Sequence, residues 1–331
     1  MLNRPGLGEL REMYRRMVLV RRLEEELGRL HAEGRTRGPI HRCDGQEAVG
    51  IGATAALEPE DVVTSTHRGH AHYVGKGVPL GPLLAEILGR ATGSCGGRAG
   101  HMLVADPAVG LLGGCGIVGG MLPVAVGQAL AFQVRGEPRV VCAFLGDGAA
   151  QIGAAHEAMN LAGLWRLPVV FVIEHNGFGL TVPTAAQSAV AELAVRARGY
   201  GMPGLSVDGN DVRAVFAAVA EAAARARRGG GPSSIEARTY RLEGFSTSDL
   251  GGYRDPAEIA AWRARDPILR LRAELLPELG ESALLSLEGE AERELSAALE
   301  AALAAPLPAA EALAAPEYVE EAGAAREAAR A

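Results

Sequence analysis

Residues 139–179 read RVVCAFLGDGAAQIGAAHEAMNLAGLWRLPVVFVIEHNGFG and determine the class of fold. They contain two apolar runs of strand length, Arg139–Leu145 and Pro168–Ile173, with a helix-like segment at 151–164 between them. Apolar runs of this kind are typical of strands that are buried on both faces of a parallel sheet. The stretch therefore predicts a βαβ unit with a right-handed crossover.

The same alternation extends in both directions from this unit. We expect further strands at Val62–Thr66, Leu205–Val207 and Ser233–Tyr240, and helices at 189–197 and 211–228. Strands that alternate with helices predict an α/β protein with a doubly wound parallel sheet, covered by helices on both faces. The Gly-rich residues 93–100 and 110–120 and the polar residues 243–255 are expected to be loops.

The two ends of the chain are expected to be helical. Apolar residues at helical spacing predict a long amphipathic helix over 8–33, which Gly34 ends. The members of this apolar stripe are Leu10, Met13, Met17, Val20, Leu23, Leu27 and Leu30. Further helices are expected at 46–57, 80–90 and 122–134. The organisation predicted is an N-terminal helical extension (1–60), an α/β domain (61–255) and a C-terminal helical segment (256–331).

Composition excludes several classes of function. The formal net charge is −7 without a basic stripe, so nucleic acid is not an expected partner. No apolar run approaches the roughly 20 residues that span a bilayer, and the N-terminus lacks the apolar core of a signal peptide. We expect a cytoplasmic protein that does not bind membranes. Its four cysteines form no C-x-x-C pair, which favours reduced structural thiols over a zinc site.

The chemistry is expected at the carboxyl ends of the two central strands. In a parallel sheet ligands bind beyond these ends, where Gly146-Asp147-Gly148 follows one strand and Asn176 the next. A carboxylate, an amide oxygen and a backbone carbonyl suit Mg²⁺, and diphosphate oxygens can complete its octahedron. The helix that opens after Gly148 offers free N–H groups to an anion. The sequence therefore predicts a site that holds a diphosphate through a metal.

Here a family resemblance becomes specific. Gly146-Asp147-Gly148, followed after 26 residues by His175-Asn176, resembles the thiamine-diphosphate motif, which normally ends in Asn-Asn. Over about residues 10–275 the chain resembles the α subunits of thiamine-diphosphate-dependent 2-oxo acid dehydrogenases and of acetoin dehydrogenase. The segments that carry the resemblance besides 139–179 are IHRCDGQEAVGIG, TSTHRGHAHYVGKG, GRATGSCGGRAGHM, GCGIVGGMLPVAVGQAL and TYRLEGFSTSDLGGYRDPAEI.

The resemblance implies a thiamine-diphosphate-binding fold and a set of site residues. Mg²⁺ would be held by Asp147, Asn176 and the carbonyl of Phe178. The cofactor would be contacted by His67, Arg68, Gly148 and Ala149 around the diphosphate and by Gly116 and Val118 at the aminopyrimidine. His41 would lie near the reacting end, and the other candidates for catalytic positions are His67, Phe245 and Ser246.

Two departures from the family pattern bear on the chemistry. His175 replaces the first Asn of the motif, which we expect to be tolerated because Asn176 is the residue that matches the metal ligand. Phe245 stands where the family usually has an active-site His, and Phe can neither donate nor accept a proton. The substitutes available nearby are His70, His72 and His101, the last at a position where the family commonly has Ser.

The resemblance also implies partners and leaves three hypotheses of function open. The family forms α2β2 tetramers in which a glutamate of the β subunit activates the cofactor, so this chain should be inactive alone. The first hypothesis is a dehydrogenase α subunit that decarboxylates a 2-oxo acid, or cleaves an acyloin such as acetoin, and passes the acyl group to a lipoyl-bearing acyltransferase. The second, favoured by Phe245, is a two-chain carboligase or transketolase-like enzyme. The third is a catalytically silent assembly subunit.

Two other motifs are explained better without a separate function. Gly114-x-Gly116-x-x-Gly119 matches the dinucleotide fingerprint, but no clear strand is predicted before it, and Glu137 lies in a turn rather than at a strand end. His67, His70 and His72 could form a zinc site by composition, but their spacing gives no common face.

Overall fold

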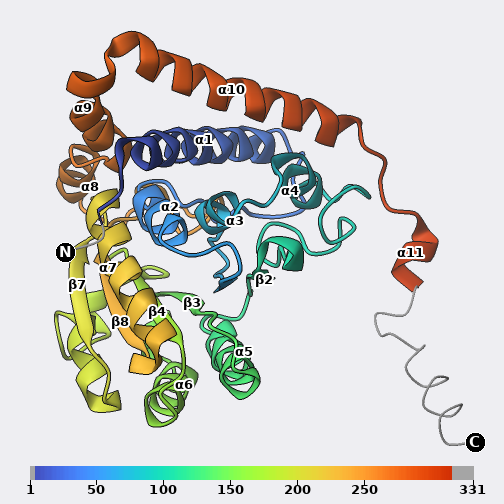
Figure 1. The fold of residues 1–331 in the computed structure, drawn as a ribbon. Coiled ribbons are helices and arrows are strands. Elements are labelled where there is room, and N and C mark those ends of the chain that lie inside the picture. The colour runs from blue at the N-terminus through green and yellow to red at the C-terminus, as the bar shows by residue number, and fades with distance from the viewer. Residues whose placement is uncertain (1–3, 315–331) are drawn as a thin grey trace, which may run out of the picture.

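The computed structural model describes residues 4–314 and shows a six-stranded sheet in which every pairing is parallel (Figure 1). The strand order is β2-β1-β3-β4-β8-β7. The strands are β1 (Val62–Thr64), β2 (Leu111–Gly113), β3 (Val141–Gly146), β4 (Val169–His175), β7 (Gly204–Asp208) and β8 (Ser233–Arg238). The expectation of an α/β protein with a parallel sheet is therefore confirmed.

Helices pack on both faces of the sheet because side chains of a strand alternate between the faces. In β3, Val141, Ala143 and Leu145 belong to one apolar core, whereas Cys142 and Phe144 belong to the other. The first core is closed by α5 (Met121–Arg135) and α6 (Gly153–Leu164), and the second by α2 (Glu47–Ala55), α3 (His70–Lys76), α4 (Leu80–Ile87) and α7 (Val212–Arg225). The continuous apolar runs of the sequence follow from burial on both sides.

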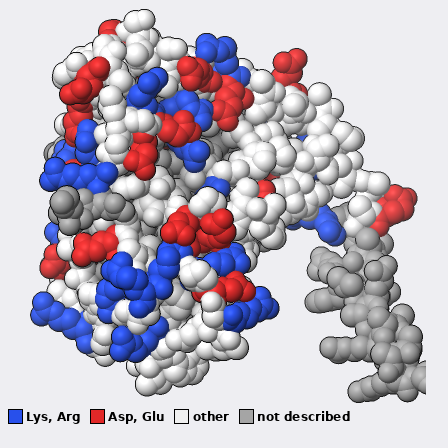
Figure 2. All heavy atoms as spheres, in the orientation of Figure 1, with Lys and Arg blue, Asp and Glu red and all other residues white. Residues whose placement is uncertain are grey.

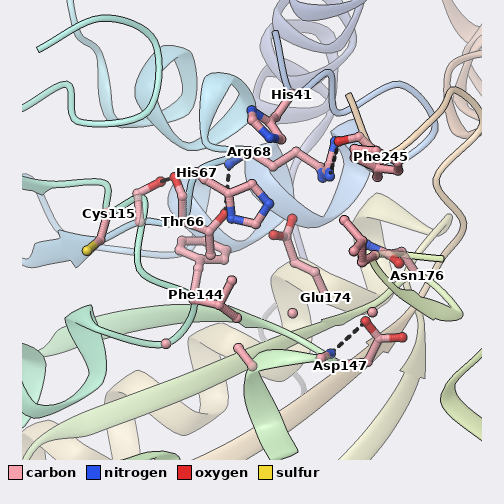
Figure 3. Close-up of a pocket in the computed structure, with 18 of the residues that line it drawn as sticks. His41, Thr66, His67, Arg68, Cys115, Phe144, Asp147, Glu174, Asn176 and Phe245 are labelled. Carbon is pink, nitrogen blue, oxygen red and sulfur yellow. Dashed lines mark hydrogen bonds between the residues drawn. The ribbon is translucent and has the colours of Figure 1, made fainter. Parts of the chain in front are cut away.

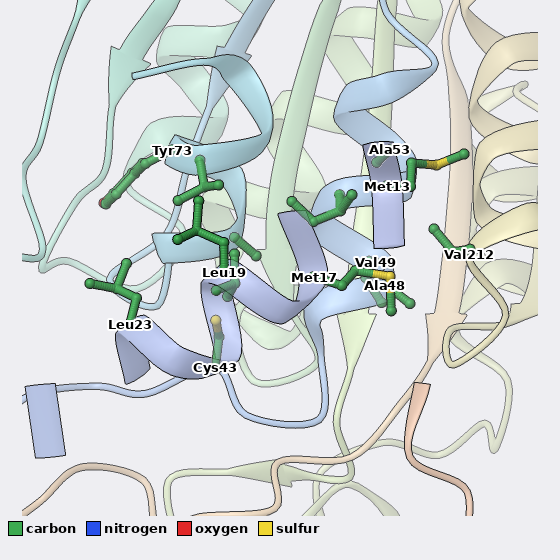
Figure 4. Close-up of a cluster of buried hydrophobic side chains, with 14 of the residues drawn as sticks. Met13, Met17, Leu19, Leu23, Cys43, Ala48, Val49, Ala53, Tyr73 and Val212 are labelled. Atoms are coloured by element: carbon green, nitrogen blue, oxygen red, sulfur yellow. The ribbon is translucent and has the colours of Figure 1, made fainter. Parts of the chain in front are cut away.

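The N-terminal helix forms as its apolar stripe predicts. It is α1 (Leu7–Ala32), and all seven residues of the stripe are at most 3% exposed. Figure 4 shows side chains of α1, such as Met13, Met17 and Leu23, packed near Val49 of α2 and Tyr73 of α3. This helix thus covers the layer of helices that lies directly on the sheet.

The C-terminal part adds the helices α8 (Pro256–Arg263), α9 (Pro267–Leu279), α10 (Glu281–Ala304) and α11 (Ala310–Ala314). In Figure 1, α10 runs along the outer side of α1. The two are joined by an ion pair from Arg15 to Glu294 and by a hydrogen bond of 2.6 Å from the Tyr14 hydroxyl to Glu288. The end of the predicted C-terminal segment, 315–331, lies outside the described residues.

Local sequence patterns missed several short elements. Residues 110–120 were expected to be a loop, but Leu111–Gly113 form β2, because this segment pairs with β1 in the register Val63↔Leu111. Helix α3 and the hairpin of β5 (Phe178–Gly179) and β6 (Val182–Pro183) were not predicted. The helix expected at 189–197 is a 3-10 helix, η4 (Leu193–Tyr200). Further short helical turns are η1 (Pro107–Val109), η2 (Ala149–Gln151), η3 (Thr184–Ala186) and the π-helical η5 (Ala226–Gly230).

The surface agrees with the mixed charge of the sequence. On the face shown in Figure 2, acidic and basic side chains are interspersed. No helix among residues 4–314 is long and apolar enough to cross a membrane. All four cysteines are free thiols, with Cys43 and Cys142 buried.

The packing of α1 predicts a selective loss of stability. Leu23 is fully buried, so Leu23→Ala leaves a cavity and should lower the free energy of unfolding by about 2–5 kcal/mol. Leu7 of the same helix is 44% exposed, and Leu7→Ala should cost less than about 1 kcal/mol. Urea denaturation of the purified variants measures both values. Equal losses would show that α1 does not form this core.

Candidate active site

A cavity of about 230 Å³ opens at the carboxyl edge of the sheet (Figure 3). It lies beyond the ends of β1 and β3, which are adjacent strands. From β1 the chain crosses to β2 on one side, and from β3 it crosses to β4 on the other side. The cavity therefore occupies a topological switch point, where ligands bind in open parallel sheets.

The register of the two central strands brings the predicted metal ligands together. Gly146 of β3 pairs with Glu174 of β4, so the next residues, Asp147 and His175, are neighbours. Nε2 of His175 lies 3.9 Å from Oδ2 of Asp147. Asn176 follows at the same edge, as the sequence predicts.

The unpredicted hairpin completes the surroundings of Asp147. Gly177, with φ of +93°, makes the turn that leads from Asn176 into β5. The hairpin returns to Thr184, whose hydroxyl donates a hydrogen bond to Oδ2 of Asp147. The N–H of Gly148 donates to the other carboxylate oxygen at 3.0 Å. Asp147 is thus a buried carboxylate held by partners on both oxygens.

Asn176 also lines the cavity, and hydrogen bonds fix both ends of its side-chain amide. Its Nδ2 donates to Oε1 of Gln46 at 3.2 Å, and its Oδ1 accepts the N–H of Phe178 at 3.2 Å. Nε2 of Gln46 is buried without a hydrogen-bond partner among the described residues. Gln46 lines the cavity, and its amide group therefore lacks one of the hydrogen bonds that a buried amide usually makes.

Two buried arginines give the cavity a positive wall. Arg68, which in Figure 3 extends toward Phe245, donates to the backbone carbonyls of Arg42 and Phe245 at 2.6 and 2.9 Å. Arg241 donates to the carbonyl of Leu180 and the hydroxyl of Tyr253, and its Nε has no hydrogen-bond partner among the described residues. Within residues 4–314 neither guanidinium pairs with a carboxylate.

No carboxylate among the described residues balances the positive charges of these two arginines, and the pKa values of both are lowered. Burial, with the charge of Arg241 nearby, lowers the pKa of Arg68 to about 10. Burial likewise lowers the pKa of Arg241. A buried cation without a counter-ion is costly, so the cavity favours an anionic ligand.

His175 connects the site to the next strand. Its Nδ1 lies 2.6 Å from Oε1 of Glu236, a fully buried residue of β8. Burial alone would raise the pKa of Glu236, but hydrogen bonds from His175 and the N–H of Ala194 lower it. The residue that replaces the first Asn of the motif is therefore accommodated by a specific partner.

Histidines form the opposite wall of the cavity, above Asp147 in Figure 3. The rings of His41 and His67 meet edge to face, with centroids 5.0 Å apart. Burial lowers the pKa of His41 to about 4 and that of His67 to about 3, and Arg68 adds to both shifts. Both are neutral imidazoles near pH 7, and Phe245, which lines the same cavity, has no titratable group.

The structure brings nearly all predicted site residues to this one cavity. The lining includes His41, His67, Arg68, Gly116, Val118, Asp147, Gly148, Ala149, Asn176, Phe178 and Phe245. Ser246 does not line it; its hydroxyl lies 2.8 Å from that of Ser248 within the loop. The catalytic role predicted for Ser246 stays a prediction.

Sequence reasoning missed several side chains of the site, namely Gln46, Glu174, Thr184 and Arg241. The available signal for Glu174 and Arg241 was their position near the ends of strands. For Gln46 the available signal was its place in the segment IHRCDGQEAVGIG, which carries part of the family resemblance. Nothing local marked Thr184, because the hairpin that returns it to Asp147 was not predicted.

A buried carboxylate orders the Gly-rich segment that precedes His101. Oε2 of Glu86 accepts the N–H groups of Cys95 and Gly97, both at 2.8 Å. Oε1 accepts those of Ala99 and Gly100 at 2.6 and 3.2 Å. Glu86 thereby replaces the hydrogen bonds that a helix or strand would have provided.

One reason given against a dinucleotide site is wrong. A strand, β2, does end at Gly113, directly before the Gly-rich fingerprint. Glu137 nevertheless lies between α5 and β3 and contacts Arg139 on the surface, so it is not at a strand end. Gly116 and Gly119 instead line the cavity with the other site residues.

Fold and cavity together define a parallel α/β protein with a candidate anion site at the switch point of its sheet. The model of the dehydrogenase E1 component family matches residues 15–311, and the chain belongs to this family. The resemblance to α subunits of thiamine-diphosphate-dependent 2-oxo acid dehydrogenases, stated from the sequence, is thus confirmed.

Named relatives agree with this assignment. The chain is 43% identical over 293 residues to the α subunit of acetoin:2,6-dichlorophenolindophenol oxidoreductase of Bacillus subtilis, covering 87% of this chain and 88% of that protein. It is 39% identical over 311 residues to the subunit of the same name from Cupriavidus necator, covering 93% of each. It is 38% identical over 308 residues to the pyruvate dehydrogenase E1 component subunit alpha of Zymomonas mobilis, covering 92% of this chain and 87% of that protein.

The role of Glu86 can be tested directly. Glu86→Gln turns an acceptor into a donor that faces two N–H groups, which should cost about 2–4 kcal/mol of stability. Hydrogen exchange measured by mass spectrometry should accelerate within 93–101. Glu278→Gln, at an exposed position, is the control and should change neither value. Unchanged exchange in the Glu86 variant would contradict the role given to this carboxylate.

Proposed function

We propose that this chain is the α subunit of a two-chain thiamine-diphosphate-dependent dehydrogenase that acts on a 2-oxo acid or on acetoin. The observation that carries the proposal is one cavity that is lined by two buried arginines without a carboxylate partner among the described residues and also by a set of oxygen donors. The arginines are Arg68 and Arg241, and the donors are Asp147, Asn176 and the carbonyl of Phe178. The named relatives, an acetoin oxidoreductase subunit and a pyruvate dehydrogenase subunit, give the class of substrate.

The residues present fit the diphosphate end of this cofactor. A diphosphate supplies the counter-charge that the two buried arginines lack among the described residues. One carboxylate, one amide oxygen and one backbone carbonyl suit Mg²⁺, a hard cation that prefers oxygen. The helices on both faces and the cavity at the switch point support a doubly wound, thiamine-diphosphate-binding fold.

Division of labour within the site follows from these positions. When bound, thiamine diphosphate supplies the electron sink for breaking the bond next to the carbonyl. The chain's own residues neutralise the diphosphate, position it and exclude water from the buried side. His41 and His67 are neutral and lie on the opposite wall of the cavity. There they can accept a proton from a group near the reacting end of the cofactor.

Apolar side chains at the mouth of the cavity support a β partner. Ile117 is 73% exposed, Leu180 is 63% exposed and Val118 is 44% exposed, and all three line the cavity. Apolar groups at the rim of a polar site are typical of a surface that a partner covers. We infer that a β subunit contributes the rest of the site, including the activating glutamate, in an α2β2 assembly. Acyl transfer to a lipoyl-bearing acyltransferase and a cytoplasmic location belong to the same proposal.

The comparisons support the dehydrogenase hypothesis and not the other two. Phe245 lines the cavity at the position where the resemblance expects a His, and this is the one observation that favours a carboligase. A silent subunit is disfavoured because unpaired buried arginines and a buried Asp147 have a cost that a chain without a ligand would not bear.

The activity is tested with the reconstituted complex. The chain and its co-purifying β partner, with thiamine diphosphate and Mg²⁺, should reduce 2,6-dichlorophenolindophenol in the presence of acetoin or one of a panel of 2-oxo acids. Reduction should require both chains, because half of the site lies on the partner. No reduction while the cofactor is bound would exclude the dehydrogenase, and the mixture would then be examined for new carbon–carbon products.

The metal site is tested by calorimetry on the same complex. Asp147→Ala removes the carboxylate of the donor set and should reduce the affinity for thiamine diphosphate with Mg²⁺ by about 100-fold or more. Asp147→Asn keeps the size of the side chain and separates the loss of charge from a packing defect. Glu60→Ala, an exposed acid, is the control. Unchanged affinity in both Asp147 variants would contradict the site assignment.

A further inference from the structure

One ring nitrogen of His101 contacts two nitrogen atoms of His41. The backbone N–H of His41 donates to Nε2 of His101 at 3.2 Å, and Nδ1 of His41 lies 3.0 Å from the same Nε2. The two rings are nearly parallel, with an interplanar angle of 20°. His101 is only 7% exposed and does not itself line the cavity.

These contacts determine where the protons are. A backbone N–H can only donate, so Nε2 of His101 must offer a lone pair and its proton is on Nδ1. Nδ1 of His41 then has an acceptor opposite it and must carry a proton itself. A neutral His41 consequently has its free lone pair on Nε2. Turning the ring of His101 over would place a carbon atom against both donors and lose both hydrogen bonds.

Burial supports this state. It lowers the pKa of His101 to about 2 and the pKa of His41 to about 4, so both rings are neutral near pH 7. Nε2 of His41 makes no hydrogen bond within the described chain, and the residue lines the cavity. His67 also lines it, but no side-chain hydrogen bond to a described residue selects its tautomer.

The segment that carries His101 is itself anchored. Glu86 accepts four N–H groups from residues 95–100, and the hydroxyl of Tyr73 donates to the carbonyl of His101 at 3.3 Å. The acceptor for His41 is therefore supplied by an ordered element that lies 60 positions away in the sequence.

We propose that His101 is a positioning residue that holds His41 in the Nδ1–H tautomer, so that Nε2 of His41 is the proton acceptor of the active site. This rests on the proposed function, because the proton comes from a hydroxyl or other acidic group of the bound substrate. The proton moves to Nε2, and the resulting imidazolium keeps its Nδ1–H bond to His101. The pair supplies the imidazole chemistry that Phe245 cannot.

Two variants of His101 separate the tautomer from packing. His101→Gln places an amide oxygen where Nε2 was and can still accept from His41, whereas His101→Leu removes the acceptor at similar volume. In the reconstituted complex, kcat/KM should fall by about 10-fold or more for His101→Leu and stay within about 3-fold for His101→Gln. Affinity for thiamine diphosphate should be unchanged in both. His31→Leu, at the end of α1 and away from the cavity, is the matched control.

The tautomer itself is measured without turnover. Solid-state ¹⁵N NMR of the complex, labelled at the histidines of this chain, reports which ring nitrogen of His41 is protonated, and His41→Gln identifies its signals. The wild-type chain and His101→Gln should show a protonated Nδ1 and an unprotonated Nε2, and His101→Leu should lose this preference.

Each result decides between separate claims. Protonation of Nε2 in the wild-type chain would overturn the tautomer, and wild-type kinetics in His101→Leu would overturn the positioning role. A complex that shows the expected tautomer but neither binds thiamine diphosphate nor turns over would refute the proposed function and the catalytic part of this inference.

Discussion

The parallel pairing of β3 with β4 is the interaction on which the site depends. Its register aligns Gly146 with Glu174 and so places Asp147 beside His175, with Asn176 one residue further. A shift of this register by one residue would turn each apolar side chain of β4 to the other face and separate the donor set. The two apolar cores that hold the register in place are therefore also what holds the site together.

Two positively charged side chains at the cavity come from distant parts of the chain. Arg68 follows β1 and Arg241 follows β8, and both are buried at the cavity without a carboxylate partner among the described residues. Partly exposed arginines such as Arg15 and Arg21 pair with Glu294 and Glu47, whereas Arg68 and Arg241 are 5% and 2% exposed and have no such partner. An anion bound between them, as proposed for the diphosphate, would offset the cost of burying two cations without a counter-ion.

Much of the fold could be predicted because its central elements are determined locally. β3 and β4 carry apolar runs, and α1 carries a stripe at helical spacing, so each was identified within a few residues of its observed limits. The side chains that lie directly at strand ends, Asp147 and Asn176, were placed correctly for the same reason.

β2 was missed because three residues become a strand only through pairing with β1, which lies nearly 50 positions earlier in the sequence. Thr184 reaches Asp147 only through a hairpin, and His101 meets His41 only because Glu86 folds the Gly-rich segment. These contacts depend on tertiary structure and leave no local pattern.

The central claim is that the cavity between β1 and β3 holds the diphosphate and its metal. An experimental structure of this chain with its β partner, thiamine diphosphate and Mg²⁺ tests it most directly. We expect the diphosphate between Arg68 and Arg241, and Mg²⁺ bound by Asp147, Asn176 and the carbonyl of Phe178. A cofactor bound elsewhere, or a diphosphate that leaves both arginines without a contact, would contradict the account.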